Sequence, residues 1–422
     1  MSRLEQLIQQ HCPDGVEWKP FFDVCDFVRG ITYNKQQEAR TEVDAYKVLR
    51  ANNITLNLNT LNFDDVKFVV NDVKVKPTQF LYRGDILMCA GSGSKEHIGK
   101  VAYINEDMDY TFGGFMSVVR CKDVLLPRFM FHILTGGLFT QHLEREIKSS
   151  TINNINNQVM QSLSIPVPPL PVQEEIVRIL DNFAELQAEL QAELQKRLQQ
   201  YNYYRDKLLS FNDLNGGGGG YAVSVEWKKL GDIATLIRGG NFQKKDFTDS
   251  GVPCIHYGQI YTHFGIHTTS TLKYISPEVA SKSKIAKTND IVMAITSENV
   301  EDVGKCVAWL GEEDIAVSGH TAIIQHKQNA KYLSYYFHTS HFFTQKKKLA
   351  HGTKVIEISP KDLANVIIPI PSLEEQQRIV DILDRFNILT NDITAGLPAE
   401  IEARRKQYEY YRDQLLTFKQ KA

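Results

Sequence analysis

The sequence predicts an α+β protein in which two mixed α/β globular domains are each followed by a long helix. Three observations predict this class: an internal duplication, short apolar runs bounded by glycines, and helical apolar spacing without Gly or Pro over about forty residues. The chain has 422 residues, of which 42% are hydrophobic and 23% charged, as in ordinary globular proteins. Length alone suggests two or three domains.

The duplication is seen as motifs that recur in the same order. VEWK at 16–19 recurs at 225–228, DILM at 85–88 as DIVM at 290–293, IPVP at 165–168 as IPIP at 368–371, and YYRD at 203–206 at 410–413. Ordered matches of this extent indicate a genuine repeat. We therefore place a first globular domain at 1–165, a central spacer helix at 166–214, a glycine-rich linker at 215–224, a second globular domain at 225–368 and a C-terminal helix at 369–422.

Within each globular domain, apolar runs follow turn signals. The segments 80–88 and 287–293 indicate a turn followed by a buried strand. The aromatic segments 129–134 and 332–338 are typical of core, either helix or strand. Each domain should therefore mix α and β structure.

The first long helix is predicted over 172–211, where apolar residues recur at spacings of three and four. At 1.5 Å per residue it would be about 60 Å long. The preceding proline-rich segment 165–171 is predicted to be extended. The tetrapeptide AELQ occurs three times at 184–195 and favours a helical spacer, one copy of which is worth about 6 Å.

The second long helix is predicted over 373–418, with a kink or restart near Gly396 and Pro398. An interior proline costs a helix about 3 kcal/mol, which is the reason for expecting the break. Two apolar stripes in one chain most simply pack on each other, and the pattern alone permits either relative direction.

Catalytic and metal-binding signatures are missing from the sequence. No phosphate-binding loop, dinucleotide fingerprint, HExxH, GxSxG elbow or Cys/His metal spacing is present, and the scattered histidines predict no metal site. The six cysteines form no CxxC pair, no apolar run reaches membrane-spanning length, and the N-terminus lacks a secretory pattern, so a cytoplasmic protein is expected. These observations favour a binding protein over an enzyme.

Polar and basic clusters beside glycines are the candidate binding residues. Lys and Arg neutralise phosphates, whereas Asn, Gln, Ser and Thr can read base edges. Each cluster alone is typical of a solvated loop, but the two copies differ most at these positions, as expected if they read different targets. The predicted DNA-contacting residues are Thr32, Tyr33, Lys35, Ser92, Ser94, Lys95, Lys148, Ser150, Thr151, Asn153, Arg238, Asn241, Gln243, Lys244, Ser297, Asn299, Lys346, Lys347, Thr353 and Lys354.

The net charge of −2 is an average over unlike parts of the chain. Residues 225–365 carry 17 Lys and Arg against 14 Asp and Glu, whereas 16–160 carry 17 of each. Near-neutrality therefore does not exclude a DNA partner.

Taken together, these motifs resemble the specificity subunit of a Type I restriction-modification system. The resemblance covers essentially the whole chain. It rests on IPVP with QEEI at 173–176, IPIP with EEQQRI at 374–379, the two YYRD motifs, GDIL at 84–87 with NDIV at 289–292, and the pairs Gly99-Lys100 and Gly304-Lys305.

The resemblance implies two target-recognition domains, each reading one half of a split, asymmetric double-stranded DNA site. It also implies that the two helices pack as an antiparallel coiled coil and set the separation of the halves. Two modification subunits would carry S-adenosylmethionine and methylate adenine, and restriction subunits would use ATP and Mg. This chain would itself be non-catalytic, with no cofactor, no metal and no membrane contact. The alternatives are a two-domain coiled-coil adaptor for a non-DNA ligand and a fusion with its own methyltransferase, whose motifs are missing.

Overall fold

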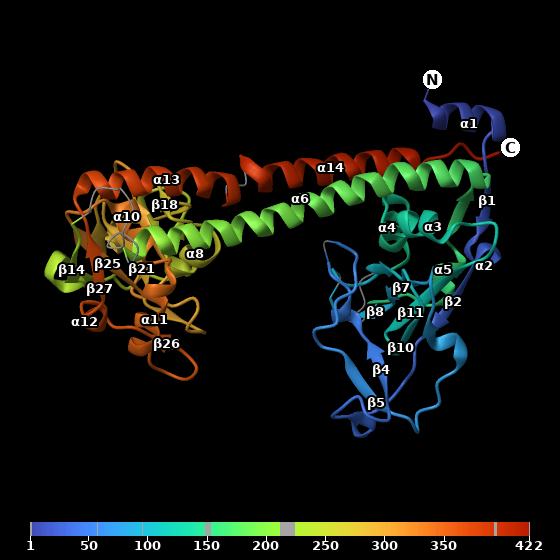
Figure 1. The fold of residues 1–422 in the computed structure, drawn as a ribbon, viewed down its shortest axis with the longest axis horizontal. Helices are drawn as coiled ribbons and strands as arrows, with labels where there is room; N and C mark the ends of the chain where they lie inside the picture. The colour runs from blue at the N-terminus through green and yellow to red at the C-terminus, as the bar shows by residue number, and fades with distance from the viewer. Residues whose placement is uncertain are drawn as a thin grey trace, which may run out of the picture. The chain divides into compact units, whose positions relative to one another are not determined.

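The computed structural model describes residues 2–56, 58–94, 96–147, 153–211, 224–391 and 395–421. The chain forms two compact units, Met1–Leu190 with Ile401–Ala422 (unit 1) and Gln191–Glu400 (unit 2). Each unit therefore contains one globular domain and segments of both long helices, which are α6 (Leu170–Ser210) and the successive α13 (Leu373–Asn391) and α14 (Gly396–Leu415) (Figure 1).

Ring stacking inside each unit defines how the long helices pair. In unit 1, Phe183 of α6 stacks on Tyr411 of α14 with ring centroids 5.7 Å apart. In unit 2, Tyr204 of α6 stacks on Phe386 of α13 at 5.8 Å. The earlier residue of α6 pairs with the later residue of the C-terminal helices, so the two helices are antiparallel. The predicted fold class is confirmed.

Unit 1 is built on a four-stranded sheet with the order β2-β11-β7-β9 and a five-stranded sheet with the order β3-β5-β4-β10-β6. Two further pairs, β1 with β13 and β8 with β12, are antiparallel. The strands are β1 (Glu17–Pro20), β2 (Cys25–Arg29), β3 (Glu38–Ala39), β4 (Ala45–Leu49), β5 (Lys67–Val70), β6 (Phe80–Leu81), β7 (Ile86–Cys89), β8 (Gly91–Ser92), β9 (Val101–Tyr103), β10 (Met108–Phe112), β11 (Met116–Cys121), β12 (Asn153–Asn154) and β13 (Ser164–Val167). The helices before α6 are α1 (Arg3–His11), α2 (Phe21–Val24), α3 (Pro127–Leu134), α4 (Gly137–Glu146) and α5 (Asn157–Gln161).

Unit 2 repeats this plan with sheets β15-β25-β21-β23-β18 and β16-β19-β17-β24-β20. The pairs β14 with β27 and β22 with β26 correspond to β1 with β13 and β8 with β12. Its strands are β14 (Glu226–Lys229), β15 (Ala234–Arg238), β16 (Phe247–Thr248), β17 (Val252–Ile255), β18 (His267–Thr268), β19 (Lys273–Ile275), β20 (Lys284–Ala286), β21 (Ile291–Ala294), β22 (Thr296–Ser297), β23 (Cys306–Trp309), β24 (Ile315–Val317), β25 (Thr321–His326), β26 (Ile356–Glu357) and β27 (Ile367–Ile370). Its short helices are α7 (Leu230–Ile233), α8 (Tyr257–Thr262), α9 (Pro277–Ser281), α10 (Ala330–Tyr336), α11 (Ser340–Leu349) and α12 (Pro360–Leu363).

The predicted turn-and-strand segments form the centre of each domain. β7 and β21 are buried along their whole length, and each follows a turn residue in the left-handed region, Gly84 (φ 89°) and Asn289 (φ 74°). Gly and Asn are the residues that tolerate this region best. The aromatic segment 129–134 falls on the buried helix α3, and residues 332–336 of the second segment fall on the buried helix α10, so both segments are helical.

A buried glutamine joins each long helix to its domain. Gln173 of α6 accepts a hydrogen bond from the Leu126 amide at 2.8 Å and donates to the Pro168 carbonyl at 2.7 Å. In unit 2, Gln376 accepts from the Asn329 amide and donates to the Pro371 carbonyl. Both side chains are fully buried, so losing either would leave backbone groups without partners. This role explains why Gln173 and Gln376 belong to the repeated motifs.

The long helices begin and break close to where the sequence predicts. The sequence predicts an extended segment over the whole of 165–171, but α6 already begins at Leu170. Pro171 is tolerated there because the first turn of a helix needs no donor from its own N–H. The break near Gly396 is confirmed, since α13 ends at Asn391 and α14 begins at Gly396, whose φ is 75°.

Candidate nucleic-acid interface

One edge of the four-stranded sheet gathers loops from distant parts of unit 1. β2 and β7 both pair antiparallel with β11, so their C-terminal ends lie together where β11 begins. The chain leaves β2 towards Thr32 and Tyr33, leaves β7 towards Ser92, and enters β11 through Phe115. We call this region the β-edge of unit 1.

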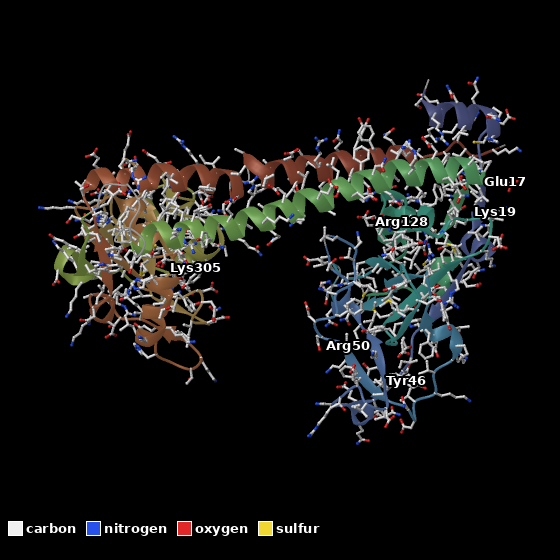
Figure 2. All side chains as sticks on the ribbon, in the orientation of Figure 1. Glu17, Lys19, Tyr46, Arg50, Arg128 and Lys305 are labelled. Atoms are coloured by element: carbon white, nitrogen blue, oxygen red, sulfur yellow. The ribbon has the colours of Figure 1, made fainter. Side chains whose placement is uncertain are left out.

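A cleft of about 1070 Å³ opens beside this β-edge. Its lining includes Thr32 and Tyr33, which the sequence predicts, and Arg50, Asn52 and Phe115, which it does not. The Arg50 guanidinium lies 2.7 Å from an Asp65 carboxylate oxygen. Arg50 follows β4, in the part of unit 1 remote from α6 (Figure 2). The cleft therefore combines apolar walls with a few fixed polar groups.

The other predicted residues of unit 1 lie at or near the same edge. Ser92 of β8 pairs with the backbone of Asn153 in β12, and the Ser94 amide donates to the Ser92 hydroxyl at 3.1 Å. Thr32, Lys35 and Ser94 are exposed. Lys95, Lys148, Ser150 and Thr151 lie outside the described residues.

Unit 2 builds the equivalent edge from β15, β21 and β25. The exposed predicted residues here are Asn241, Gln243, Lys244, Asn299, Thr353 and Lys354. The loop with Thr353 and Lys354 lies close to Ser297, because β26 pairs with β22 and brings Ile356 opposite Ser297. Most of the predicted set therefore lies around one edge, which we call the β-edge of unit 2. Lys347 lies apart, exposed on α11.

Arg238 and its counterpart Arg29 are engaged with their own domains. The Arg29 Nε donates to the Gly114 carbonyl at 2.7 Å, and its terminal nitrogens donate to Asn154 Oδ1 at 3.2 Å. The Arg238 Nε donates to the Gly319 carbonyl at 3.2 Å, and Nη1 lies 2.9 Å from a Glu357 carboxylate oxygen. Both arginines thus tie the end of one strand to the loop that enters the next.

Lys346 does not lie on any surface, which corrects its prediction as a DNA contact. Its side chain is 5% exposed, and Nζ donates to the carbonyls of Glu301 and Val303 at 2.8 and 2.6 Å. Burial lowers the pKa of Lys346 to about 8. The run of three lysines at 346–348 suggested a solvated face, but the register of α11 turns its first member inward.

Sequence reasoning missed Phe115 and His320. Phe115 follows Gly114 and His320 follows Gly319, two glycines separated by the same 205 residues as the DILM and DIVM motifs. Each residue stands directly before the equivalent strand, β11 or β25. Phe115 is 66% exposed, and His320 is exposed beside the Tyr257 ring, 5.0 Å between centroids. The aligned glycines were the signal that could have led to them.

Within the described ranges, no cluster of His, Cys, Asp and Glu could hold a metal ion. No helix in these ranges is both long and apolar enough to cross a bilayer.

The chain is similar to known proteins both in sequence and in fold. The family described as "Type I restriction modification DNA specificity domain" matches residues 13–200 and 223–403. The chain is similar to the Type I restriction enzyme EcoR124I/EcoR124II specificity subunit of Escherichia coli, with 38% identity over 334 residues that cover 74% of this chain and 78% of that protein. It is 29% identical over 433 residues to a putative type I restriction enzyme specificity subunit of Haemophilus influenzae, covering 98% of both.

A solved structure from work on assembly and conformational transition of the type I R-M system has a similar fold. Its TM-score is 0.57 at 19% identity, and the match covers 95% of this chain and 96% of that chain.

Proposed function

Because the chain belongs to the Type I restriction-modification specificity family and so recognises DNA target sites as a non-catalytic subunit, we propose that it reads a two-part, asymmetric site, with one half for each domain. The observation that carries this proposal is that the two units have equivalent β-edges. These β-edges are built on corresponding strands but carry different exposed side chains. Phosphate contacts position a protein on DNA, whereas base contacts specify the sequence.

Some equivalent positions of the two β-edges carry the same residue, and others carry different residues. Both kinds are expected if the two domains bind different half-sites. Lys35 and Lys244 begin equivalent short 3-10 turns, and both are exposed. Such shared lysines suit phosphate, which is the same in every sequence. In contrast, Thr32 stands where unit 2 has Asn241. An Asn side chain can bond adenine with two hydrogen bonds, which a Thr side chain cannot do.

The spacing between the half-sites is proposed to depend on the AELQ repeats of α6. The helix is continuous from Leu170 to Ser210, and Leu186 within the repeats is 38% exposed, so these residues are not locked into a core. Removing four residues shortens a helix by about 6 Å and turns it by about 40° beyond a full turn, which nearly retains its apolar face. That length corresponds to one or two base-pair steps of about 3.4 Å.

The test is to express the chain with modification subunits in a host without DNA methylation and to sequence the methylome. We expect a two-part motif with a fixed gap. Deleting residues 188–191 should shorten the gap by one or two base pairs and leave both half-sites unchanged. Gln191→Ala is the matched control, because it alters the same repeat without changing its length. An unchanged gap would refute the spacer role, and altered half-sites would refute the division between domains and helix.

We further propose that two modification subunits, which bind S-adenosylmethionine, dock on equivalent surfaces of the two units. Tyr203 and Tyr410, the first residues of the YYRD motifs, are 61% and 62% exposed. Each lies one turn before an aspartate that accepts a hydrogen bond from the start of a domain helix, Asp206 from Ser340 and Asp413 from Gly137. A surface present twice in one chain suits two copies of one partner. ATP and Mg are expected on restriction subunits, not on this chain.

A further inference from the structure

Phe115 and His320 occupy the same backbone position in the two units. The Phe115 carbonyl accepts from the Ala90 amide at 2.9 Å, and the His320 carbonyl accepts from the Ile295 amide at 3.0 Å. Both residues stand immediately before the strand that forms the centre of each β-edge, β11 or β25. The backbone is therefore shared, and only the side chain differs.

The chain around each position is held rigidly. The Arg29 and Arg238 side chains bind the carbonyl of the preceding glycine, Gly114 or Gly319. The backbone before each position is also closely packed, because a Cβ atom on Gly30 would clash with the backbone oxygens of Phe112 and Gly113, and one on Gly239 with the backbone oxygen of Ser318. A side chain mounted on such a segment loses little further entropy when it contacts a ligand.

The two side chains offer opposite chemistry to a partner. The Phe115 ring is exposed and lies over Gly91, where an added Cβ would be 2.8 Å from the ring. It offers no hydrogen-bonding group to a partner. In His320, Nδ1 is hydrogen-bonded to the Thr296 hydroxyl at 3.0 Å, and no described residue bonds Nε2. Nε2 is therefore available for a hydrogen bond with a partner.

We propose that Phe115 and His320 are equivalent specificity-determining residues, each reading a base in its own half-site. Phe115 contacts an apolar feature, for which the thymine methyl group is the base-edge candidate, and His320 forms a hydrogen bond with a base edge. Arg29 and Arg238 act as positioning residues for Phe115 and His320, respectively. This inference rests on the proposed function, since it requires that each domain reads one half of the site.

The experiment uses the full chain in complex with its modification subunits and three variants: Phe115→Ala, Phe115→His and His320→Phe. The methylome of each strain gives the motif, and binding is then measured on duplexes carrying the motif of the unchanged protein. Phe115→Ala should weaken binding about 10-fold and relax one position of one half-site. His320→Phe should change one position of the other half-site. The salt dependence of binding should stay the same, because neither residue neutralises phosphate.

Val124→Ala is the matched control, because this residue is 45% exposed but lies beyond the opposite end of β11. Phe115→His separates a fold defect from a recognition defect, since the same backbone already carries histidine in unit 2. The inference would be overturned if all three variants kept the motif of the unchanged protein and bound it with affinities within twofold of the unchanged protein. The absence of a two-part motif for the unchanged protein would instead overturn the proposed function.

Discussion

The burial of Lys346 can be tested directly, because unit 1 has a leucine at the equivalent position. In unit 1 the Cβ position of Gly99 faces Leu143 of α4, and in unit 2 the equivalent Gly304 faces Lys346 of α11. The position of a partly buried leucine is thus taken by a buried lysine whose Nζ bonds two backbone carbonyls. The perturbation is Lys346→Met, which keeps an unbranched side chain and removes the charge.

The magnitude follows from the lowered pKa of Lys346, about 8 against 10.5 for an ordinary lysine. Between these values the unfolded chain holds the proton and the folded chain does not, so the free energy of unfolding rises with pH. At pH 7 the buried charge costs nearly the full shift, about 3 kcal/mol, and at pH 10 it costs under about 1 kcal/mol. The cost of burying the Lys346 charge therefore differs by about 2–3 kcal/mol between pH 7 and pH 10.

The assay is thermal unfolding of the unchanged protein and the variant at pH 7 and pH 10. The stability of Lys346→Met relative to the unchanged protein should be higher at pH 7 than at pH 10. The reason is that Lys346 loses its proton at high pH, so the unchanged protein no longer has a buried charge, whereas the variant has none at either pH. For a unit of about 200 residues, 2–3 kcal/mol corresponds to a shift of about 5–10 °C in the melting temperature. The prediction concerns this change with pH, since Met also leaves two carbonyls without their donor.

Lys347→Met is the control, because the adjacent lysine is exposed on the same helix. It should show no comparable change between the two pH values. A relative stability of Lys346→Met that is equal at pH 7 and pH 10 would refute the burial of a charged lysine at this position.

Two further predictions concern charges at equivalent or exposed positions. The buried carboxylate of Asp85 is paired with Arg120 at 2.6 Å. The equivalent Asp290 accepts hydrogen bonds from the Lys287 amide at 2.8 Å and from Gln325, which stands in place of Arg120, at 3.3 Å, and burial raises the pKa of Asp290. Gln325→Arg should therefore raise the melting temperature of unit 2 by about 2–4 °C, for about 1 kcal/mol, and a decrease would show that the site lacks room for the pair. Lys354→Ala should weaken DNA binding at any sequence and reduce the salt slope by about one, and an unchanged slope in titrations would remove Lys354 from the phosphate contacts.

The repeat was readable from sequence because its motifs are local. An apolar run that follows a turn is a local signal for a buried strand. The runs at 85–88 and 290–293 carry this signal, and the structure contains the strands β7 and β21 there. Gly396 and Pro398 predicted the helix break for a similarly local reason, since backbone freedom and a missing donor act within one turn. The family resemblance rests on the same short motifs.

The candidate site was only partly predictable. Polar residues beside glycines pointed to loops that the structure gathers at the two β-edges, and loops at strand ends often carry recognition side chains. The same reasoning selected Lys346 as exposed, and it did not foresee that Arg238 also binds the Gly319 carbonyl and Glu357 of its own domain. The burial of Lys346 depends on the register of α11 against the loop at 299–305, and the partners of Arg238 lie 81 and more residues away along the chain.

The sequence by itself determined the duplicated plan, the strand centres and the extent of the two long helices, because periodicity and turn chemistry are properties of neighbouring residues. Only the tertiary structure decided that Asp413 of the last helix completes the start of α4 in the first domain. Likewise, only the structure placed Phe115 and His320 at one equivalent position on the two β-edges. Contacts of this kind join residues far apart in the chain, and their partners depend on packing that no local pattern encodes.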